Sequence, residues 1–274
     1  MKFERFERRL LARGAAELSY CDTLAGELPV VLQHGLCGSA RQTAEAFPDD
    51  DRLRLLTLEC RGHGASPIGP LQEISLARFA DDVVALIDAL PLAPVMLGGI
   101  SMGAAIALRI AIRRPERVRA LMLLRPAWIT DAAPANMRAN AEVGELLART
   151  SPAEARALFE AGATARRLAA EAPDNLASLR GFFDREPAAE TAALLSRIAA
   201  DGPGITEDEV RALALPALVI GHEHDAIHPM ACARALVALL RHGELVEITP
   251  KSVDREAYVH DLQAAVAAFI EKAA

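Results

Sequence analysis

The stretch GISMG, from Gly99 to Gly103, holds a serine between two glycines with the spacing G-x-S-x-G. An apolar run, PVMLGGI, precedes the serine, and MGAAIALRIAIRR follows it with the pattern of a buried helix. A serine on a sharp strand-to-helix turn exposes its hydroxyl at the edge of a sheet, and small neighbours are needed because the backbone is crowded there. The N–H of Met102 would lie at the helix N-terminus, where it can bind a developing oxyanion. We therefore expect Ser101 to be a nucleophile.

A second stretch, GHEHDAIHP, combines three of the chain's seven histidines with two acids directly after an apolar run. Imidazole and carboxylate groups are good zinc ligands, so His222, His224, Asp225 and His228 could form a metal site. The same residues could instead supply the acid of a catalytic triad, which activates a serine without any metal. Because a serine turn is present, we favour part of a catalytic triad over a metal site, and we expect neither a metal nor another cofactor.

The composition excludes several functional classes. The 274 residues carry a net charge of -7 and no Lys/Arg block, which argues against a nucleic-acid partner. The N-terminal MKFERFERRLLARG is charged where a signal peptide needs an apolar stretch, and no run approaches the ~18 apolar residues of a membrane helix. The four cysteines are scattered without a CxxC pair, so free thiols are expected. We expect a cytoplasmic protein with a small-molecule substrate and no membrane partner; no pattern indicates an oligomeric state.

Apolar runs of strand length alternate with helical periodicity from about residue 29 onward. This alternation predicts an α/β fold with a mostly parallel twisted sheet flanked by helices on both faces. Such sheets bind ligands outside the carboxyl ends of their strands, so the residues directly after each strand matter most. Between the strands ending near 127 and beginning near 214, the pattern is helical and is broken by prolines. We expect residues 1–127 and 214–274 to form the core and residues 128–213 to form an inserted helical cap.

Four motifs, in this order, resemble those of the α/β-hydrolase family: HGLCGS, ECRGHGAS, GISMG and GHEHDAIHP. The resemblance covers nearly the whole chain, although ECRGHGAS begins with Glu where the family usually has Asp. It implies that His34 and Gly35 belong to the oxyanion loop. It also implies that Leu36 offers a second N–H beside that of Met102. Asp225 would be the triad acid, following the nucleophile in the order typical of the family.

The general base is the point at which the sequence departs from the family. A serine hydroxyl needs a base within hydrogen-bond reach, and the family usually supplies it as Gly-His after the last strand. This chain has ITPKSVDREAYVHDLQ there, without Gly-His. We expect His260, near the start of the final helix, to be the base, with His228 as the alternative; a surface position for His260 and a pocket-lining position for His228 stay open. A histidine paired with Asp225 should have a raised pKa.

The sequence therefore indicates a serine hydrolase that cleaves an ester, thioester or lactone of a small apolar acyl group through an acyl-enzyme. The alternative is a catalytically impaired relative that binds a ligand or a protein partner, because the usual Gly-His is absent. A third hypothesis, acyl transfer to an acceptor other than water, uses the same residues. A fluorophosphonate probe separates the first two, since only an activated serine is modified.

Overall fold

The structure is a computed structural model that describes residues 6–92 and 94–274. Eight strands form one sheet in the order β1-β2-β4-β3-β5-β6-β7-β8. Strands β3 to β8 are parallel to one another, and β2 is antiparallel both to β1 and to β4. The strands are β1 (Glu7–Arg13), β2 (Ala16–Asp22), β3 (Leu28–Gln33), β4 (Leu53–Leu58), β5 (Val95–Ile100), β6 (Val118–Leu124), β7 (Ala217–Gly221) and β8 (Gly243–Glu247). The predicted fold class is confirmed.

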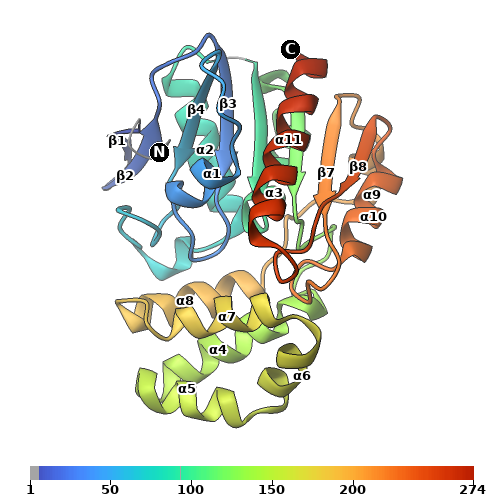
Figure 1. The fold of residues 1–274 in the computed structure, drawn as a ribbon. Coiled ribbons are helices and arrows are strands. Elements are labelled where there is room, and N and C mark those ends of the chain that lie inside the picture. Colours follow the sequence, from blue (N-terminus) through green and yellow to red (C-terminus); the bar gives the residue numbers. More distant parts are fainter. Residues whose placement is uncertain (1–5, 93) are drawn as a thin grey trace.

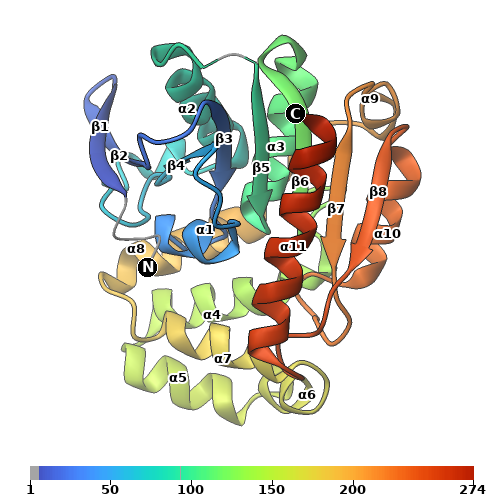
Figure 2. The same cartoon turned by 45° about the horizontal axis from the view of Figure 1, so that its top comes forward.

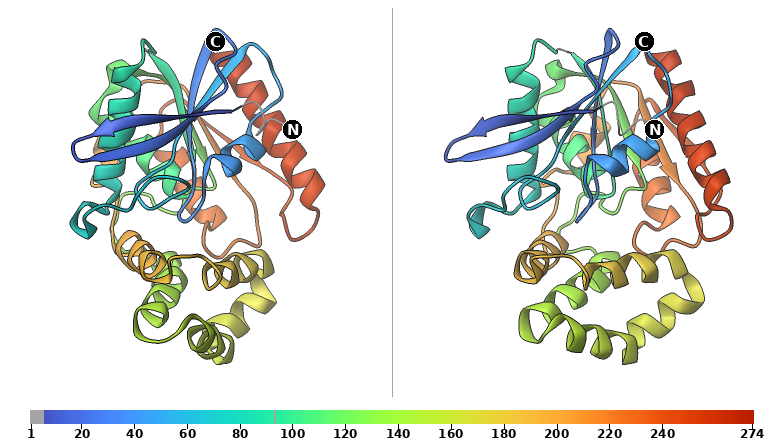
Figure 3. Two further views of the ribbon diagram at one scale, coloured as in Figure 1. Left: turned by 90° about the vertical axis from the view of Figure 1, so that its left-hand side faces the viewer. Right: turned by 60° about the vertical axis from the view of Figure 1, so that its left-hand side comes forward.

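Helices cover both faces of the sheet, as the edge-on view in Figure 3 shows. One face carries α1 (Ala40–Ala46) and α11 (Arg255–Ala273), which pack on side chains such as Val30 and Leu32. The other face carries α2 (Leu76–Ala89), α3 (Met102–Arg113) and α10 (Met230–Leu239). Because both faces are covered, the central strands are apolar throughout; every residue of β5 is buried. Ser75 caps α2 by accepting a hydrogen bond from the N–H of Arg78.

Five helices between β6 and β7 lie together below the carboxyl ends of the strands (Figure 1). They are α4 (Arg138–Arg149), α5 (Pro152–Ala161), α6 (Ala163–Glu171), α7 (Pro173–Phe182) and α8 (Ala188–Ala199). Two of the prolines that interrupt the sequence pattern are the first residues of α5 and α7, a position where a missing N–H costs nothing. A short helix, α9 (Glu207–Arg211), then leads back to β7. Figure 2 shows α4, α5 and α7 apart from the sheet, in the place expected of a cap; we keep 128–213 as its proposed limits.

The N-terminal hairpin of β1 and β2 was not predicted, because the alternation of strands and helices was recognised only from about residue 29. The hairpin extends the sheet to one side (Figure 3). Most of β1 is exposed, whereas the second half of β2 is buried beside β4. Residues 1–5 and 93 of the predicted core segment 1–127 lie outside the described residues.

A buried ion pair fixes the loop that follows β4. The Arg61 side chain is 1% exposed, and its Nε donates to Oδ2 of Asp82, also 1% exposed, over 2.7 Å. Asp82 lies on α2 and also accepts from Arg13, while Arg61 reaches Glu73. The pair therefore ties the loop to α2 and the N-terminal hairpin to the core.

Replacing Asp82 with Ala should lower the free energy of unfolding by about 3 kcal/mol, because it removes the principal partner of a buried guanidinium. The matched control is Asp208→Ala, which removes an exposed carboxylate that pairs with Arg211 at the surface of α9. Urea denaturation of both variants measures the difference. Equal decreases in the free energy of unfolding of the two variants would show that the buried ion pair contributes no more to stability than a surface ion pair.

Candidate active site

The turn between β5 and α3 is strained, as a serine elbow must be. Ser101 has a φ of 56° and a ψ of -111°, a conformation that L residues rarely adopt. Its N–H donates to the carbonyl of Leu124 over 3.0 Å, which fixes the elbow to β6. A Cβ on Gly99 would lie 2.1 Å from the carbonyl of Gly103, and a Cβ on Gly103 would lie 2.4 Å from the carbonyl oxygen of Gln33. Both glycines of the motif are thus required by close backbone contacts.

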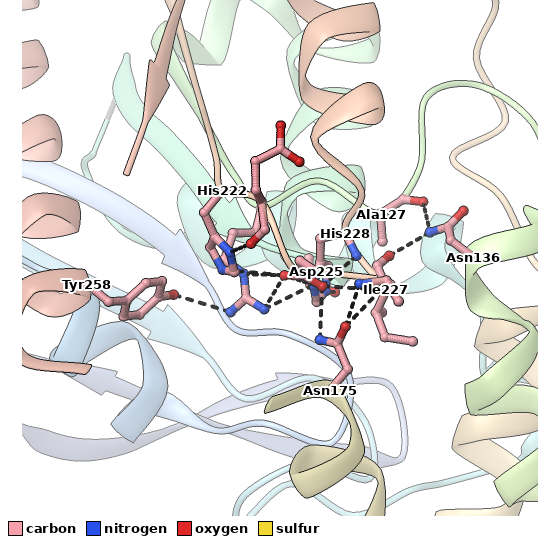
Figure 4. Close-up of polar contacts among 12 residues, drawn as sticks. Ala127, Asn136, Asn175, His222, Asp225, Ile227, His228 and Tyr258 are labelled. Carbon is pink, nitrogen blue, oxygen red and sulfur yellow. Dashed lines mark hydrogen bonds and ion pairs between the residues drawn. The ribbon is translucent and has the colours of Figure 1, made fainter. Parts of the chain in front are cut away.

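The Ser101 hydroxyl contacts an imidazole. His228 Nε2 lies 2.8 Å from Ser101 Oγ. On the other side of the ring, His228 Nδ1 lies 2.9 Å and 3.0 Å from the two carboxylate oxygens of Asp225. Because Nδ1 faces these acceptors, it carries the proton, which leaves Nε2 as an acceptor for the serine hydroxyl. Serine, imidazole and carboxylate are therefore in the order and spacing of a catalytic triad. Figure 4 shows where His228 and Asp225 lie.

His260, which the sequence favoured as the base, does not take part in this arrangement. It is on α11 as expected, but its side chain is 81% exposed and its Nδ1 faces Asp261 at 3.4 Å. Its helix position turns the ring to solvent, whereas the nearby Tyr258 is buried. The geometry instead favours the alternative, His228, which lies only three residues after Asp225.

Asp225 is held by donors from three different parts of the chain. In its own loop, the N–H of His228 donates to Oδ1 over 2.9 Å. From α7, Asn175 Nδ2 donates to the same oxygen over 2.9 Å, and Asn175 Oδ1 accepts from the N–H groups of Ala226 and Ile227. From the end of β6, Arg125 donates to Oδ2 through Nε at 3.0 Å and Nη2 at 2.6 Å. The carboxylate thus joins the core to the helices that cover it.

These contacts set the ionisation of the pair. Burial disfavours the charged form of Asp225, but the charges and hydrogen bonds of His228 and Arg125 outweigh it and hold the pKa of this carboxyl well below its usual range. Burial also lowers the pKa of His228, with Arg125 acting in the same sense and Asp225 opposing it. The expectation of a raised histidine pKa is therefore wrong, because burial and a neighbouring cation outweigh the carboxylate.

The loop after β3 approaches the elbow as the oxyanion motif implied. A Cβ on Gly35 would lie 3.4 Å from Cβ of Ser101, so this glycine allows a close approach. His34 Nε2 accepts from the N–H of Cys60, and its Nδ1 donates to the carbonyl of Gly35 over 2.8 Å. His63 Nε2 accepts from the N–H of Cys37 over 2.9 Å. Both buried imidazoles act as structural acceptors, and burial lowers the pKa of each.

The Glu that begins ECRGHGAS fits its position because a glycine lies beneath it. Glu59 is 1% exposed, and its carboxylate accepts from Arg8 and from the N–H of Ala65. Gly64 has a φ of 55°, and a Cβ there would lie 2.1 Å from the Glu59 carboxyl carbon. The longer acid therefore fits only because residue 64 has no side chain.

A cavity of about 740 Å³ opens over Ser101 between the sheet edge and the cap helices. Leu36 and His228 line it from the core, and Leu179 and Phe182 line it from α7. Lys251, in the loop where the family usually has its histidine, also lines it. Asn140, on α4, is buried in its wall, and among the described residues its amide oxygen has no hydrogen-bond partner.

The remaining histidines of GHEHDAIHP are not brought together as ligands. His222 Nδ1 faces the carbonyl of Glu223 at 2.7 Å, and its Nε2 lies 3.5 Å from Asp225 Oδ2. His224 is exposed, with a φ of 60°. Within residues 6–92 and 94–274, no group of three or more His, Cys, Asp or Glu side chains is arranged to hold a metal ion. In the same residues, no helix is both long and apolar enough to cross a membrane.

Two residues of the site were missed from the sequence. Arg125 directly follows the apolar run of β6, so a charge at the carboxyl end of a buried strand was a usable signal. Asn175 lies in a helix of ordinary composition, and nothing in its sequence context marks it.

Comparisons with known proteins agree with the observed fold. A family model described as "alpha/beta hydrolase fold" matches residues 29–252. "Putative carbamate hydrolase RutD" of Klebsiella pneumoniae is 31% identical over 80% of this chain and 82% of its own length. "sn-1-specific diacylglycerol lipase ABHD11" of Mus musculus is 30% identical over 46% of this chain, but the match spans only 39% of that protein. A thermophilic esterase structure from Thermogutta terrifontis aligns with a TM-score of 0.73 and 23% identity, over 97% of this chain and 99% of its own, and shows the shared fold.

Replacing Asn175 with Ala should lower the free energy of unfolding by about 1–3 kcal/mol, because a buried carboxylate and two backbone N–H groups each lose a partner. Asn140→Ala is the control, since it removes an amide of similar burial whose oxygen is unpartnered among the described residues. Thermal or urea denaturation measures both. A loss in Asn140→Ala as large as in Asn175→Ala would contradict the importance given to the Asp225 contacts.

Proposed function

Because the chain belongs to the alpha/beta hydrolase fold family, we propose that it is a serine hydrolase with Ser101 as nucleophile, His228 as general base and Asp225 as the acid that orients it. The observation that carries the proposal is the 2.8 Å contact between Ser101 Oγ and His228 Nε2. It replaces the base expected from the sequence, His260, with the alternative. A hydrolase role also agrees with the relatives, whose names include a carbamate hydrolase and an esterase.

The proposed reaction proceeds through an acyl-enzyme. Ser101 Oγ attacks the acyl carbon while its proton passes to His228 Nε2, and the imidazolium is held by Asp225 through Nδ1. The N–H groups of Leu36 and Met102 bind the oxyanion of the tetrahedral intermediate. His228 then protonates the departing alkoxide or thiolate, which leaves the acyl group on Ser101. Water attacks this ester and gives a proton to His228, which returns it to Ser101 Oγ as the acid is released.

The substrate we propose is an ester, thioester or lactone with a small apolar acyl group. Apolar side chains from both sides of the cavity support this proposal, among them Leu179, Phe182 and Ile227 beside the elbow. Such apolar side chains can remove a small acyl chain from water. The same residues would serve acyl transfer to an acceptor other than water, and analysis of the products separates the two reactions.

The alternative function, a non-catalytic relative that only binds a ligand, was motivated by the missing Gly-His after the last strand. That motive weakens because an imidazole lies beside the serine although it comes from another loop. The strained φ of Ser101 also favours catalysis, since strain of this kind is retained mainly at functional sites.

Replacing Ser101 with Ala or His228 with Ala should each lower kcat on short acyl esters by as much as about six orders of magnitude, because a triad acts as a unit. His260→Ala is the matched control and should leave kcat unchanged, since its ring is exposed. A fluorophosphonate probe should modify Ser101 in the wild type and in His260→Ala, but not in Ser101→Ala. A large loss of activity in His260→Ala, with His228→Ala active, would restore the sequence-based assignment.

The activity should persist into mildly acidic solution. His228 must be uncharged to accept the serine proton, and its pKa is lowered by burial and by Arg125. As pH rises through this pKa, kcat/KM should therefore increase, and the midpoint should lie below about 6.5, the ordinary value for histidine. Steady-state kinetics across a pH series checks the prediction. A midpoint above the ordinary value would mean that the carboxylate dominates the environment of the base.

A further inference from the structure

Arg125 occupies an unusual place for a cation. It directly follows β6 with a φ of 49°, and its side chain is 14% exposed. The guanidinium donates twice to Asp225 Oδ2, and its Nη1 donates to the hydroxyl of Tyr258 on α11 over 3.2 Å (Figure 4). These hydrogen bonds hold the side chain in place.

The same guanidinium lies against the candidate base. Arg125 Nη2 is 3.1 Å from His228 Nδ1, and both nitrogens face Asp225 Oδ2. A guanidinium stays protonated at any ordinary pH, so it permanently compensates the single negative charge of the carboxylate. Adding a proton to His228 would place a second cation in van der Waals contact with the first, over one shared acid. This geometry opposes the charged form of the imidazole.

We propose that Arg125 is a positioning residue that neutralises Asp225 and thereby holds His228 in its uncharged, proton-accepting form. The inference rests on the proposed role of His228 as base. In this proposal the carboxylate mainly orients His228. Because Arg125 neutralises the carboxylate, it stabilises an imidazolium much less than an unpaired acid would. Part of the transition-state stabilisation is therefore lost, but the base stays uncharged, and so active, at lower pH.

Other ionisable groups face this site, but none bridges the acid and the base in the same way among the described residues. His222, at the end of β7, approaches Asp225 with Nε2 at 3.5 Å. Tyr258 contacts Arg125 rather than His228. The charged side chains that share the cavity from α1, the loop between α7 and α8, and the loop after β8 are Arg41, Glu45, Arg185, Glu186 and Lys251. These have mixed signs, and Arg185 is already committed to Thr191 and the carbonyl of Gly62.

The test is the titration of His228 itself, followed through its ring nitrogens by NMR in the full chain. Arg125→Gln removes the charge and keeps an amide donor for Asp225; Arg125→Lys keeps the charge. Arg41→Gln is the matched control, because it removes an exposed cation of the same cavity that makes no contact with Asp225. The His228 signal is assigned by its loss in His228→Gln.

In Arg125→Gln the titration midpoint of His228 should rise by about one unit or more, while Arg125→Lys and Arg41→Gln stay near the wild type. The acid limb of kcat/KM should move with it. An unchanged midpoint in Arg125→Gln, or an equal rise in Arg41→Gln, would overturn the proposal. If Arg125→Gln does not fold, a rise of a full unit in Arg125→Lys would overturn it, because that variant retains the charge.

The titration does not depend on turnover. A protein that hydrolyses no ester yet shows the shift would refute the proposed function and leave the role of Arg125 intact. Hydrolysis that depends on His228, with no shift on removing Arg125, would refute the inference alone. A uniform fall in kcat/KM at every pH would show a merely structural contribution, which also contradicts it.

Discussion

The site depends on the buried carboxylate of Asp225. A buried charge is tolerated only where it is paired and fully hydrogen-bonded, and this one is satisfied by the end of β6, by α7 and by its own loop. Meeting that requirement closes the loop tightly enough to bring His228 back onto the acid that precedes it by three residues. In the function that we propose, the loop after β7 supplies the histidine that the family usually has in the loop after the last strand.

Around this carboxylate, backbone strain positions the serine, and neutral imidazoles shape the neighbouring loop. The elbow holds Ser101 in a left-handed conformation against β6, so its hydroxyl meets His228 without rearrangement. His34 and His63, fully buried and fixed as hydrogen-bond acceptors, shape the loop that brings Leu36 to the cavity. Three imidazoles of one protein thus have different roles because their surroundings differ: two are enclosed by backbone donors, and one lies between an acid and a hydroxyl.

Particular residues show how much of the fold and of the candidate site could be predicted from the sequence. The parallel sheet could be predicted from strand-length apolar runs. Local motifs identified Ser101 and Asp225 as candidate site residues, because the geometry of such motifs depends on a few adjacent residues. His260 was favoured because it follows the last strand, but the direction of a side chain on a helix depends on how that helix packs, and here the ring faces solvent. Arg125 and Asn175 are contributed by segments remote from GHEHDAIHP, so only the tertiary structure brings them to Asp225. The exposed β1 carries too little apolar pattern to reveal the hairpin.

The central claim is that His228 draws the proton from Ser101 so that this oxygen becomes acylated. Rapid-quench mass spectrometry after mixing the protein with p-nitrophenyl acetate tests it directly, by locating and timing the acetyl group. The account predicts an acetyl group on the peptide that contains Ser101 within one turnover in the wild type, and a greatly slowed appearance in His228→Asn. Ester hydrolysis without acetylation of Ser101, or acetylation in His228→Asn at the wild-type rate, would contradict it.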